Sequence, residues 1–212
     1  MLRGGARRDT VRVSPVLHGR RVSLRPLEAH DFRAWQEVRR RNVVWLTRWE
    51  PQRLAGQPDT VENREAFGVR CASRARERQL GTGYGFGVFA HGVYIGEMNL
   101  NSIQRGPFQS CYVGYWIDEK YAGNAYVPEA LVCAIKFAFE ELRLHRVQIA
   151  IIPRNVASRR VVEKLGIRYE GTAERYLEIN GVWEDHMRFA VTAEEWQVRG
   201  PAWEQAWIEP DD

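Results

Sequence analysis

The stretch Glu119–Leu131, EKYAGNAYVPEAL, joins a turn of small residues directly to an amphipathic helix. Apolar side chains recur at helical spacing from Val127 to Phe137, and Pro128 falls near the start, where a missing N–H costs no hydrogen bond. The run YWI just before it (115–117) indicates the end of a strand. A strand, a small-residue turn and a helix N-terminus leave unpaired amides pointing at one place. The stretch therefore predicts an anion-binding loop.

The composition is that of a soluble globular protein. The chain has 212 residues, 44% of them hydrophobic and 27% charged, which suits one domain with a sizeable core. No apolar run approaches the roughly 18–20 residues that cross a bilayer. The basic N-terminus also lacks the apolar stretch of about 7–15 residues found in a signal peptide. We therefore expect a cytoplasmic protein without membrane contact.

The cysteines and the charge narrow the possible partners. Cys71, Cys111 and Cys133 are widely spaced and form no CxxC pair, so we expect free thiols and neither a metal site nor a disulfide framework. The net charge of +4, from 31 basic and 27 acidic residues, suits an anionic cofactor but does not indicate direct nucleic-acid binding. Residues 1–14 carry several arginines, and we interpret them as a flexible basic arm, with contact to RNA as the alternative.

Residues 15–212 are predicted to form one α/β (α+β) domain around a mixed sheet. The period-two pattern of 84–117 predicts three successive antiparallel strands, and Asn180-Gly181 predicts a hairpin turn. A helix over 61–80 is expected to be capped by Asp59 or Thr60. The other expected elements are a strand at 21–26, a helix at 27–42, a connecting segment at 43–60, the helix from the loop to about 142, a strand at 146–153, a helix at 155–165, a strand at 167–171, the hairpin at 175–192 and a short helix with a packed tail at the C-terminus.

The loop at 120–125 and the elements around it resemble those of a known family. Lys120–Ala125 matches the pattern Q/R-x-x-G-x-G/A except at its first position, and NVASRRVVEKLGI (155–167) follows after one helix and one strand. This order is similar to the GNAT superfamily of acetyl-CoA-dependent N-acetyltransferases. RGPFQSCYVGYWI (105–117) and YLEINGVWEDH (176–186) resemble ribosomal-protein-alanine N-acetyltransferases of the RimJ/RimL type. Lys120 in place of Gln or Arg and Ile167 in place of Phe depart from the pattern.

The resemblance implies a single GNAT-like domain whose mostly antiparallel, twisted sheet is splayed between strands four and five and flanked by helices. The pantetheine arm of acetyl-CoA would lie between YVGYWI (112–117) and RVQIAII (146–152), bonded by backbone groups around Trp116 and Ile117. The pyrophosphate would lie on the loop. Its expected contacts are Lys120, Tyr121, Ala122, Gly123, Asn124 and Ala125.

Asn155 and Ser158 open the helix that follows the second strand. From the residues alone, Asn155 is a favoured N-cap and Ser158 lies in the first turn. The resemblance implies that Asn155 contacts the cofactor and that the Ser158 hydroxyl protonates the leaving thiolate. Tyr121 and Tyr169 are the alternatives for this acid.

The general base is left open by the sequence. An α-amine with a pKa near 8 is already partly neutral, so it needs only modest help. Glu97, on a strand beside the presumed acceptor channel, is the first candidate and Glu178 is the second. The further candidates are Glu184, Asp185 and His186.

Three functions compete at this stage. The favoured one is acetyl transfer from acetyl-CoA to a protein or peptide N-terminus that begins with Ala or Ser, on a ribosomal or other protein. The second keeps the chemistry but uses a small-molecule amine. The third is a ribosome-associated or CoA-sensing binding protein with little turnover.

Overall fold

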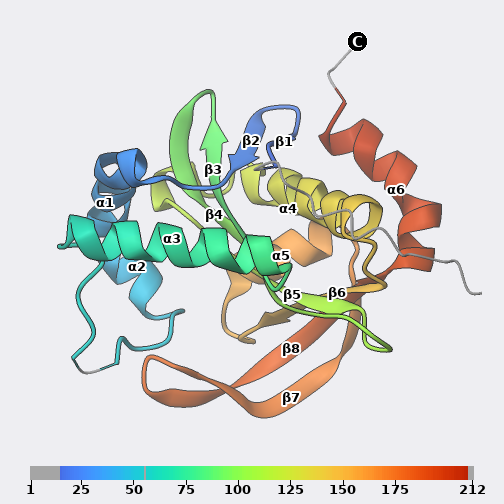
Figure 1. The fold of residues 1–212 in the computed structure, drawn as a ribbon. Helices are drawn as coiled ribbons and strands as arrows, with labels where there is room; N and C mark the ends of the chain where they lie inside the picture. The colour runs from blue at the N-terminus through green and yellow to red at the C-terminus, as the bar shows by residue number, and fades with distance from the viewer. Residues whose placement is uncertain (1–14, 55, 210–212) are drawn as a thin grey trace, which may run out of the picture.

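The strands of the protein form one twisted sheet. A computed structural model describes residues 15–54 and 56–209, so the predicted arm at 1–14 lies outside the described residues. Within them the sheet has eight strands in the order β1-β2-β3-β4-β5-β6-β8-β7 (Figure 1). Their bounds are β1 Leu17–His18, β2 Val22–Arg25, β3 Tyr84–Ala90, β4 Val93–Gln104, β5 Ser110–Ile117, β6 Arg146–Ile151, β7 Arg168–Ile179 and β8 Val182–Thr192.

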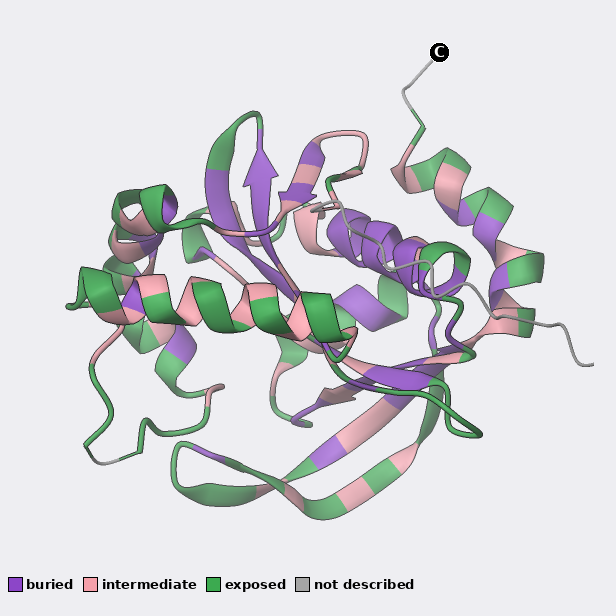
Figure 2. Cartoon of the chain, viewed as in Figure 1, coloured by how far each residue is buried: buried purple, intermediate pink, exposed green. Residues whose placement is uncertain are grey.

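Helices cover both faces of this sheet. One face meets the N-terminal helices through a cluster around Trp35, Phe67 and Tyr94, and the other meets the largest core cluster under α4. Figure 2 shows α4 buried along almost its whole length, whereas α3 is exposed along one side. The helical elements are η1 Ala29–Asp31, α1 Phe32–Arg41, α2 Val43–Thr47, α3 Arg64–Leu80, η2 Glu119–Tyr121, α4 Tyr126–Lys136, the π-helical turn η3 Phe137–Glu141, α5 Val156–Lys164 and α6 Ala193–Trp207.

The sheet opens in its centre. β5 and β6 are the one parallel pair among the described strands, and they pair only from Ser110↔Arg146 to Val113↔Ile149. β5 then continues to Ile117 without β6 beside it, while it stays paired with β4. The predicted fold class, with a mostly antiparallel sheet splayed between two central strands, is therefore confirmed.

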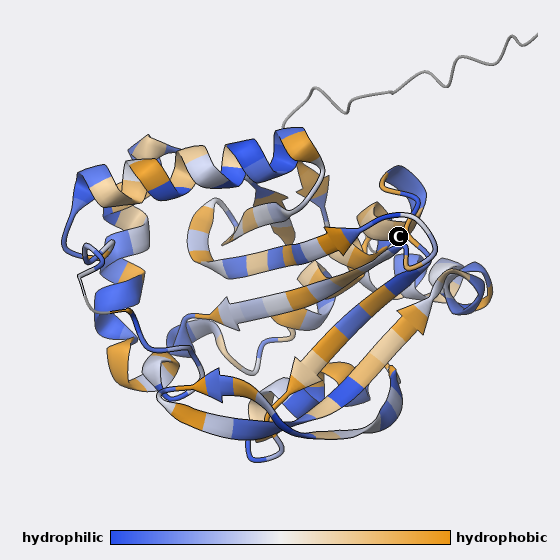
Figure 3. Cartoon of the chain, turned by 60° about the horizontal axis from the view of Figure 1, so that its bottom comes forward, coloured by the Kyte–Doolittle hydropathy of each residue, from blue (hydrophilic) through white to orange (hydrophobic). Residues whose placement is uncertain are grey.

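Tight turns connect the antiparallel strands, and the one at Asn180-Gly181 lies where it was predicted. His91 and Gly92 between β3 and β4, and Asn180 and Gly181 between β7 and β8, all have positive φ. Two consecutive residues with positive φ form the hairpin turn that matches the twist of its strands. Hydrophobic and hydrophilic residues alternate along the strands (Figure 3), as a sheet with two different faces requires.

The start of α3 differs from the prediction. Its N-cap is Asn63, whose side chain accepts a hydrogen bond from the Ala66 N–H at 3.0 Å, so the expected caps Asp59 and Thr60 are wrong. The Asp59 side chain instead accepts the Val61 N–H at 2.9 Å and forms a local turn ahead of the helix. Asp and Asn side chains can accept a hydrogen bond from a nearby amide either in a local turn or as a helix cap. Here Asp59 forms the local turn, so Asn63 caps the helix.

Three further elements were predicted incompletely. The connecting segment contains α2, and β7 is one strand from Arg168 to Ile179 with two irregularities in place of a break. The helix α6 is longer than expected and contains Pro201. A capping box between Thr192 and Glu195 starts α6, and buried Trp196 and Trp203 hold it against the core. Among the described residues, no helix is long and apolar enough to cross a membrane.

Candidate active site

The buried carboxylate of Asp118 holds the loop between β5 and α4 in place through hydrogen bonds. Asp118 accepts hydrogen bonds from Asn42 Nδ2 at 2.7 Å, from Arg41 Nη2 at 2.5 Å and from the Lys120 N–H at 3.3 Å. Burial raises the pKa of Asp118, but the hydrogen bonds from Arg41 and Asn42 outweigh it and the pKa lies below its ordinary value. Asp118 therefore stays ionised near neutral pH and ties the end of α1 to the loop.

The loop presents a run of unpaired amides. The N–H groups of residues 120–122 are bonded within the turn, to Asp118 and Glu119. By contrast, the N–H groups of residues 123–127 have no hydrogen-bond partner among the described residues. Gly123 and Ala125 both have positive φ, at 81° and 61°, which turns the chain into the start of α4. Consecutive free amides at a helix N-terminus suit a phosphate group.

This arrangement refines the predicted loop contacts. Gly123, Asn124 and Ala125 offer free amides, whereas those of Lys120, Tyr121 and Ala122 are already used. The amides of residues 126–127 complete the run, and the first-turn position of these residues in α4 is the signal that could have identified them. The residues brought together fit the pyrophosphate of a coenzyme A molecule through backbone groups.

A cation lies beside the loop. Arg21 donates from Nη1 to the Asn124 carbonyl at 3.1 Å and pairs with Glu129 at 2.9 Å. Glu129, buried in α4, also accepts the Val22 N–H at 2.9 Å, so it fastens β2 to the first turn of α4. Lys120 lies over the Tyr121 ring, with Nζ 5.9 Å from the centroid. Sequence reasoning missed Arg21, which precedes the loop by about a hundred residues.

A cleft of about 450 Å³ runs through the opening between β5 and β6. At one end of the cleft, the lining side chains come from the sheet face that α4 and α5 cover. At the other end, they come from the opposite face of the sheet. The described residues that line it include none with a carboxylate, lysine or arginine side chain. They are Trp49, Asn101, Ser102, Tyr112, Val113, Gly114, Tyr115, Ile149, Ala150, Ile151, Ile152, Asn155, Ser158, Tyr176, Leu177, Ile179 and His186.

The register of β5 decides which backbone groups face this cleft. A Cβ added at Gly96 would lie 2.2 Å from the Trp116 carbonyl oxygen, so that oxygen points toward β4. The Asp118 N–H also bonds β4, at Ile95. Backbone groups alternate along a strand, so those of Tyr115 and Ile117 point to the open edge, where Ile117 O accepts from Trp45 Nε1 at 3.1 Å. Of the two predicted contacts, Ile117 is at this edge and Trp116 faces β4.

Asn155 and Ser158 meet the cleft at the start of α5. The Asn155 side chain accepts the Ser158 N–H at 3.1 Å, which is the predicted helix cap. Ser158 Oγ lies 3.0 Å from the hydroxyl of Tyr115, a residue that sequence reasoning missed. Burial raises the pKa of Tyr115 to about 12, although its contact with Ser158 lowers it in part. The tyrosine therefore keeps its proton at neutral pH, and the two hydroxyls form a short donor chain at the cleft.

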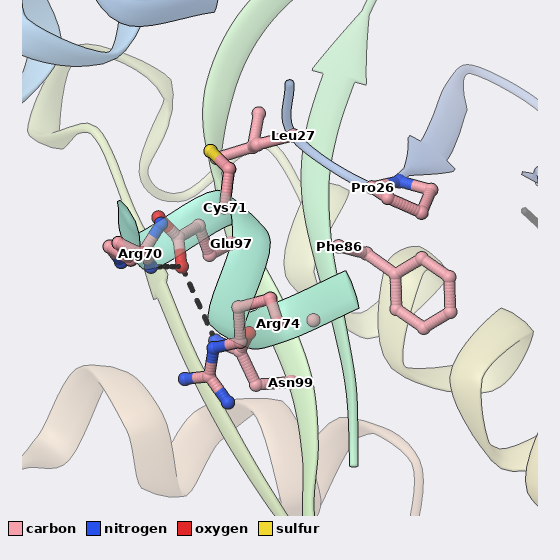
Figure 4. A pocket seen from close by; sticks show the side chains of 9 residues that line it. Pro26, Leu27, Arg70, Cys71, Arg74, Phe86, Glu97 and Asn99 are labelled. Carbon is pink, nitrogen blue, oxygen red and sulfur yellow. Dashed lines mark hydrogen bonds and ion pairs between the residues drawn. The ribbon is translucent and has the colours of Figure 1, made fainter. Parts of the chain in front are cut away.

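Glu97 lies away from the cleft, against α3. Its carboxylate accepts a hydrogen bond from Trp35 Nε1 at 2.8 Å. It also accepts one from Arg70 Nη2 at 2.6 Å, and Asn99 lies next to it (Figure 4). Burial raises its pKa, but the charge of Arg70 and the Trp35 N–H hold the pKa below its ordinary value. The structure places Glu97 in a small separate pocket that Arg74 also lines, and does not bring it to Ser158.

The remaining candidates lie on β7 and β8, except Tyr121, which lies in η2. Glu178 is exposed, and its neighbours Leu177 and Ile179 are the ones that line the cleft. Tyr169 is exposed and bonds Thr172 at 2.8 Å. Asp185 accepts the Arg175 N–H at 2.8 Å. His186 is the candidate that the structure brings to the cleft. As for the two others, Glu184 pairs with Arg154, and Tyr121 packs beside Tyr126.

Comparisons with known proteins agree with this geometry. The acetyltransferase (GNAT) domain family matches residues 21–168. The chain is 33% identical over 178 residues to the probable N-acetyltransferase YjcK of Bacillus subtilis, covering 83% of this chain and 96% of YjcK. It is 31% identical over 171 residues to the [ribosomal protein uS5]-alanine N-acetyltransferase of Escherichia coli, covering 79% of this chain and 86% of that enzyme.

A solved structure has the same architecture. RimJ of Mycobacterium smegmatis, in complex with CoA-disulfide, superposes with a TM-score of 0.76 at 27% identity, covering 88% of this chain and 93% of RimJ. The free amides at 123–127, the splayed strands and the cleft between them are consistent with a cosubstrate of this kind. The chain therefore belongs to the GNAT family and is an acetyl-CoA-dependent N-acetyltransferase.

Proposed function

We propose that the protein acetylates the α-amino group at the N-terminus of a protein or peptide, one that begins with alanine or serine, and that a ribosomal protein is the natural acceptor. The relatives supply the protein class, since one of them is named for alanine on ribosomal protein uS5. We expect the reaction in the cytoplasm, where ribosomal proteins are made.

The chemistry of the cleft carries this proposal. The described residues that line it are apolar, aromatic or neutral polar, with His186 the one imidazole among them. A lysine side chain or a polyamine is fully charged near neutral pH and calls for a carboxylate, whereas an α-amine with a pKa of about 7.7–8.0 is partly neutral. A lining without a carboxylate suits the α-amine.

Two small residues lie where the acceptor would meet the thioester. Gly114 and Ala150 lie on facing strands where β5 and β6 separate, and both line the cleft. Small side chains at this point leave room for the reacting groups to pass between the strands. The aromatic rings of Trp49, Tyr112 and Tyr176 surround the acceptor end.

The chain's own residues divide the work in this proposal. The amides of residues 123–127 bind the pyrophosphate of acetyl-CoA, with Arg21 beside them. The backbone groups of Tyr115 and the Ile117 N–H at the open edge of β5 orient the pantetheine arm and the thioester carbonyl, since the Ile117 carbonyl is already bonded to Trp45. Ser158, bonded to Tyr115, donates a proton to the leaving sulfur.

A panel of acceptors tests the proposal through release of free thiol from acetyl-CoA. It contains peptides beginning with Ala, Ser, Leu and Arg, the same peptides blocked at the α-amine but carrying lysine, and small amines such as spermidine and free amino acids. We expect turnover with the Ala and Ser peptides and loss of turnover when the α-amine is blocked. Turnover with small amines alone would contradict the proposal and support a small-molecule acceptor. CoA binding without turnover on any member would support a binding protein.

A further inference from the structure

His186 occupies the acceptor end of the cleft. It lies on β8, is 2% exposed and lines the cleft on the sheet face opposite to Tyr115 and Ser158. The face follows from its neighbours, because Arg188 shares it and bonds Gln148, while Met187 and Phe189 pack into the core under α4. His186 and Ser158 therefore reach the same opening from opposite sides of the sheet.

The hydrogen bond of its ring fixes the tautomer. His186 Nδ1 lies 2.9 Å from the Glu184 carbonyl oxygen. A carbonyl oxygen only accepts, so Nδ1 carries the hydrogen, and the neutral imidazole then has its lone pair on Nε2. Among the described residues, Nε2 has no hydrogen-bond partner. The nitrogen able to take up a proton is thus the one left for a ligand.

The charged and titratable groups around the ring are engaged elsewhere. On β8, Glu184 pairs with Arg154, Asp185 accepts the Arg175 N–H, and Arg188 donates to Gln148. On β7, the Tyr176 ring packs edge to face against the His186 ring with the centroids 5.8 Å apart, and its contact with Tyr112 of β5 raises the pKa of Tyr176. Among the described residues, no carboxylate is hydrogen-bonded to or paired with the His186 ring.

We propose that His186 is the general base of the reaction and takes a proton from the acceptor amine through Nε2. The inference rests on the proposed acetyl transfer and holds for whichever amine turns over. The ammonium gives one proton to Nε2, and the neutral nitrogen attacks the thioester carbon. The N–C bond forms, the C–S bond breaks, and the nitrogen loses its second proton. One proton ends on the sulfur by way of Ser158, and the other leaves His186 for solvent.

The discriminating variant is His186→Asn. The asparagine Nδ2 can replace Nδ1 as donor to the Glu184 carbonyl, so the local bond is kept while the titratable nitrogen is lost. We expect kcat to fall about 100-fold at pH 7.5, with the Kd for CoA within twofold of the parent. The acid limb of kcat against pH should move up to the ionisation of the peptide α-amine, near 8. His145→Asn, at an exposed histidine that bonds Glu194, is the matched control and should match the parent.

Two results would overturn the proposal. One is a His186→Asn enzyme within threefold of the parent, or a slower one whose pH profile is unchanged. The other is loss of CoA binding in both His186→Asn and His186→Gln, which would give the residue a structural role. Imidazole added to His186→Ala should restore part of the rate if the base is missing. The parent enzyme is first assayed on the acceptor panel, so failure of the N-terminal acceptor is seen separately from failure of His186.

Discussion

Glu97 and His186 are both ionisable residues with almost no exposed surface, 3% and 2%. They differ in how many of their hydrogen-bonding atoms have partners inside the protein. The Glu97 carboxylate has an ion pair with Arg70 and a bond from Trp35, and it is enclosed by α1 and α3. His186 lines the cleft with one ring nitrogen bonded to a backbone carbonyl, and among the described residues the other nitrogen has no hydrogen-bond partner.

The difference distinguishes two roles of a buried ionisable group. Removing a carboxylate whose partners all lie inside the protein leaves a buried charge uncompensated, so such a group is costly to change without being placed to meet a substrate. A ring with one fixed and one open nitrogen is held in place yet still able to exchange a proton. The predictions below test this distinction between the Glu97 cluster (Glu97, Arg70 and Trp35) and the cleft.

The largest effect is expected from Glu97→Gln. The substitution leaves the Arg70 guanidinium, which is 25% exposed, without its counter-charge, so the free energy of unfolding should fall by about 3 kcal/mol. Urea unfolding followed by fluorescence measures it. The rate per folded molecule should change little. Glu178→Gln, at the exposed carboxylate on β7, is the control and should change neither quantity; a 100-fold loss of rate in either variant would instead mark the base there.

Ser158→Ala should show the opposite pattern. It removes the proposed proton donor, so kcat should fall about 100-fold, while the Kd for CoA and the unfolding free energy stay close to those of the parent. Tyr115→Phe keeps the ring and removes the hydroxyl 3.0 Å from Ser158, and kcat should fall by a smaller factor of about ten. Kinetics equal to the parent at all pH values for Ser158→Ala would remove it from the mechanism.

The loop gives a smaller effect through its backbone. Gly123 has a φ of 81° and nothing within 4 Å of an added Cβ, so Gly123→Ala costs only the left-handed conformation, about 1 kcal/mol. Because the free amides follow from this conformation, CoA affinity should weaken about tenfold. Gly106→Ala has the same backbone cost at φ 67° in another turn and should leave CoA affinity unchanged. Calorimetric titration of both variants decides whether the loop binds the cosubstrate.

The smallest expected effect is a dependence of stability on pH. The pKa of Glu97 is lowered in the folded protein, so its stabilisation is present above the pKa of the unfolded chain, about 4.3, and is lost as the pH falls through the folded value. The difference in unfolding free energy between the parent and Glu97→Gln should therefore be greatest near pH 7 and narrow below about pH 4. A difference that stays constant from pH 7 to pH 3.5 would show that ionisation of Glu97 is not the cause.

Local patterns predicted the elements that rest on neighbouring residues. The Asn155 cap, the turn at Asn180-Gly181 and the loop before α4 were all correct, because each depends on a few residues at fixed spacing. The two strands that border the opening were named from the resemblance to the GNAT superfamily, and the structure confirms that they separate. The cap of α3 was missed because Asp59 and Asn63 both suit the position, and only the local turn at Asp59 decides between them.

By itself, the sequence predicted the strands, the Asn180-Gly181 turn and the Asn155 cap, because these are short-range properties of the chain. Its resemblance to the GNAT superfamily implied the family and the splayed sheet. Only the tertiary structure decided which polar side chains meet. It placed Arg70 and Trp35 on Glu97, and it brought Tyr115, Ser158 and His186 to one opening from three separate elements. The physical reason is that burial, charge pairing and access to a cleft depend on which helix covers which face of a strand, and residues distant in the chain set that packing.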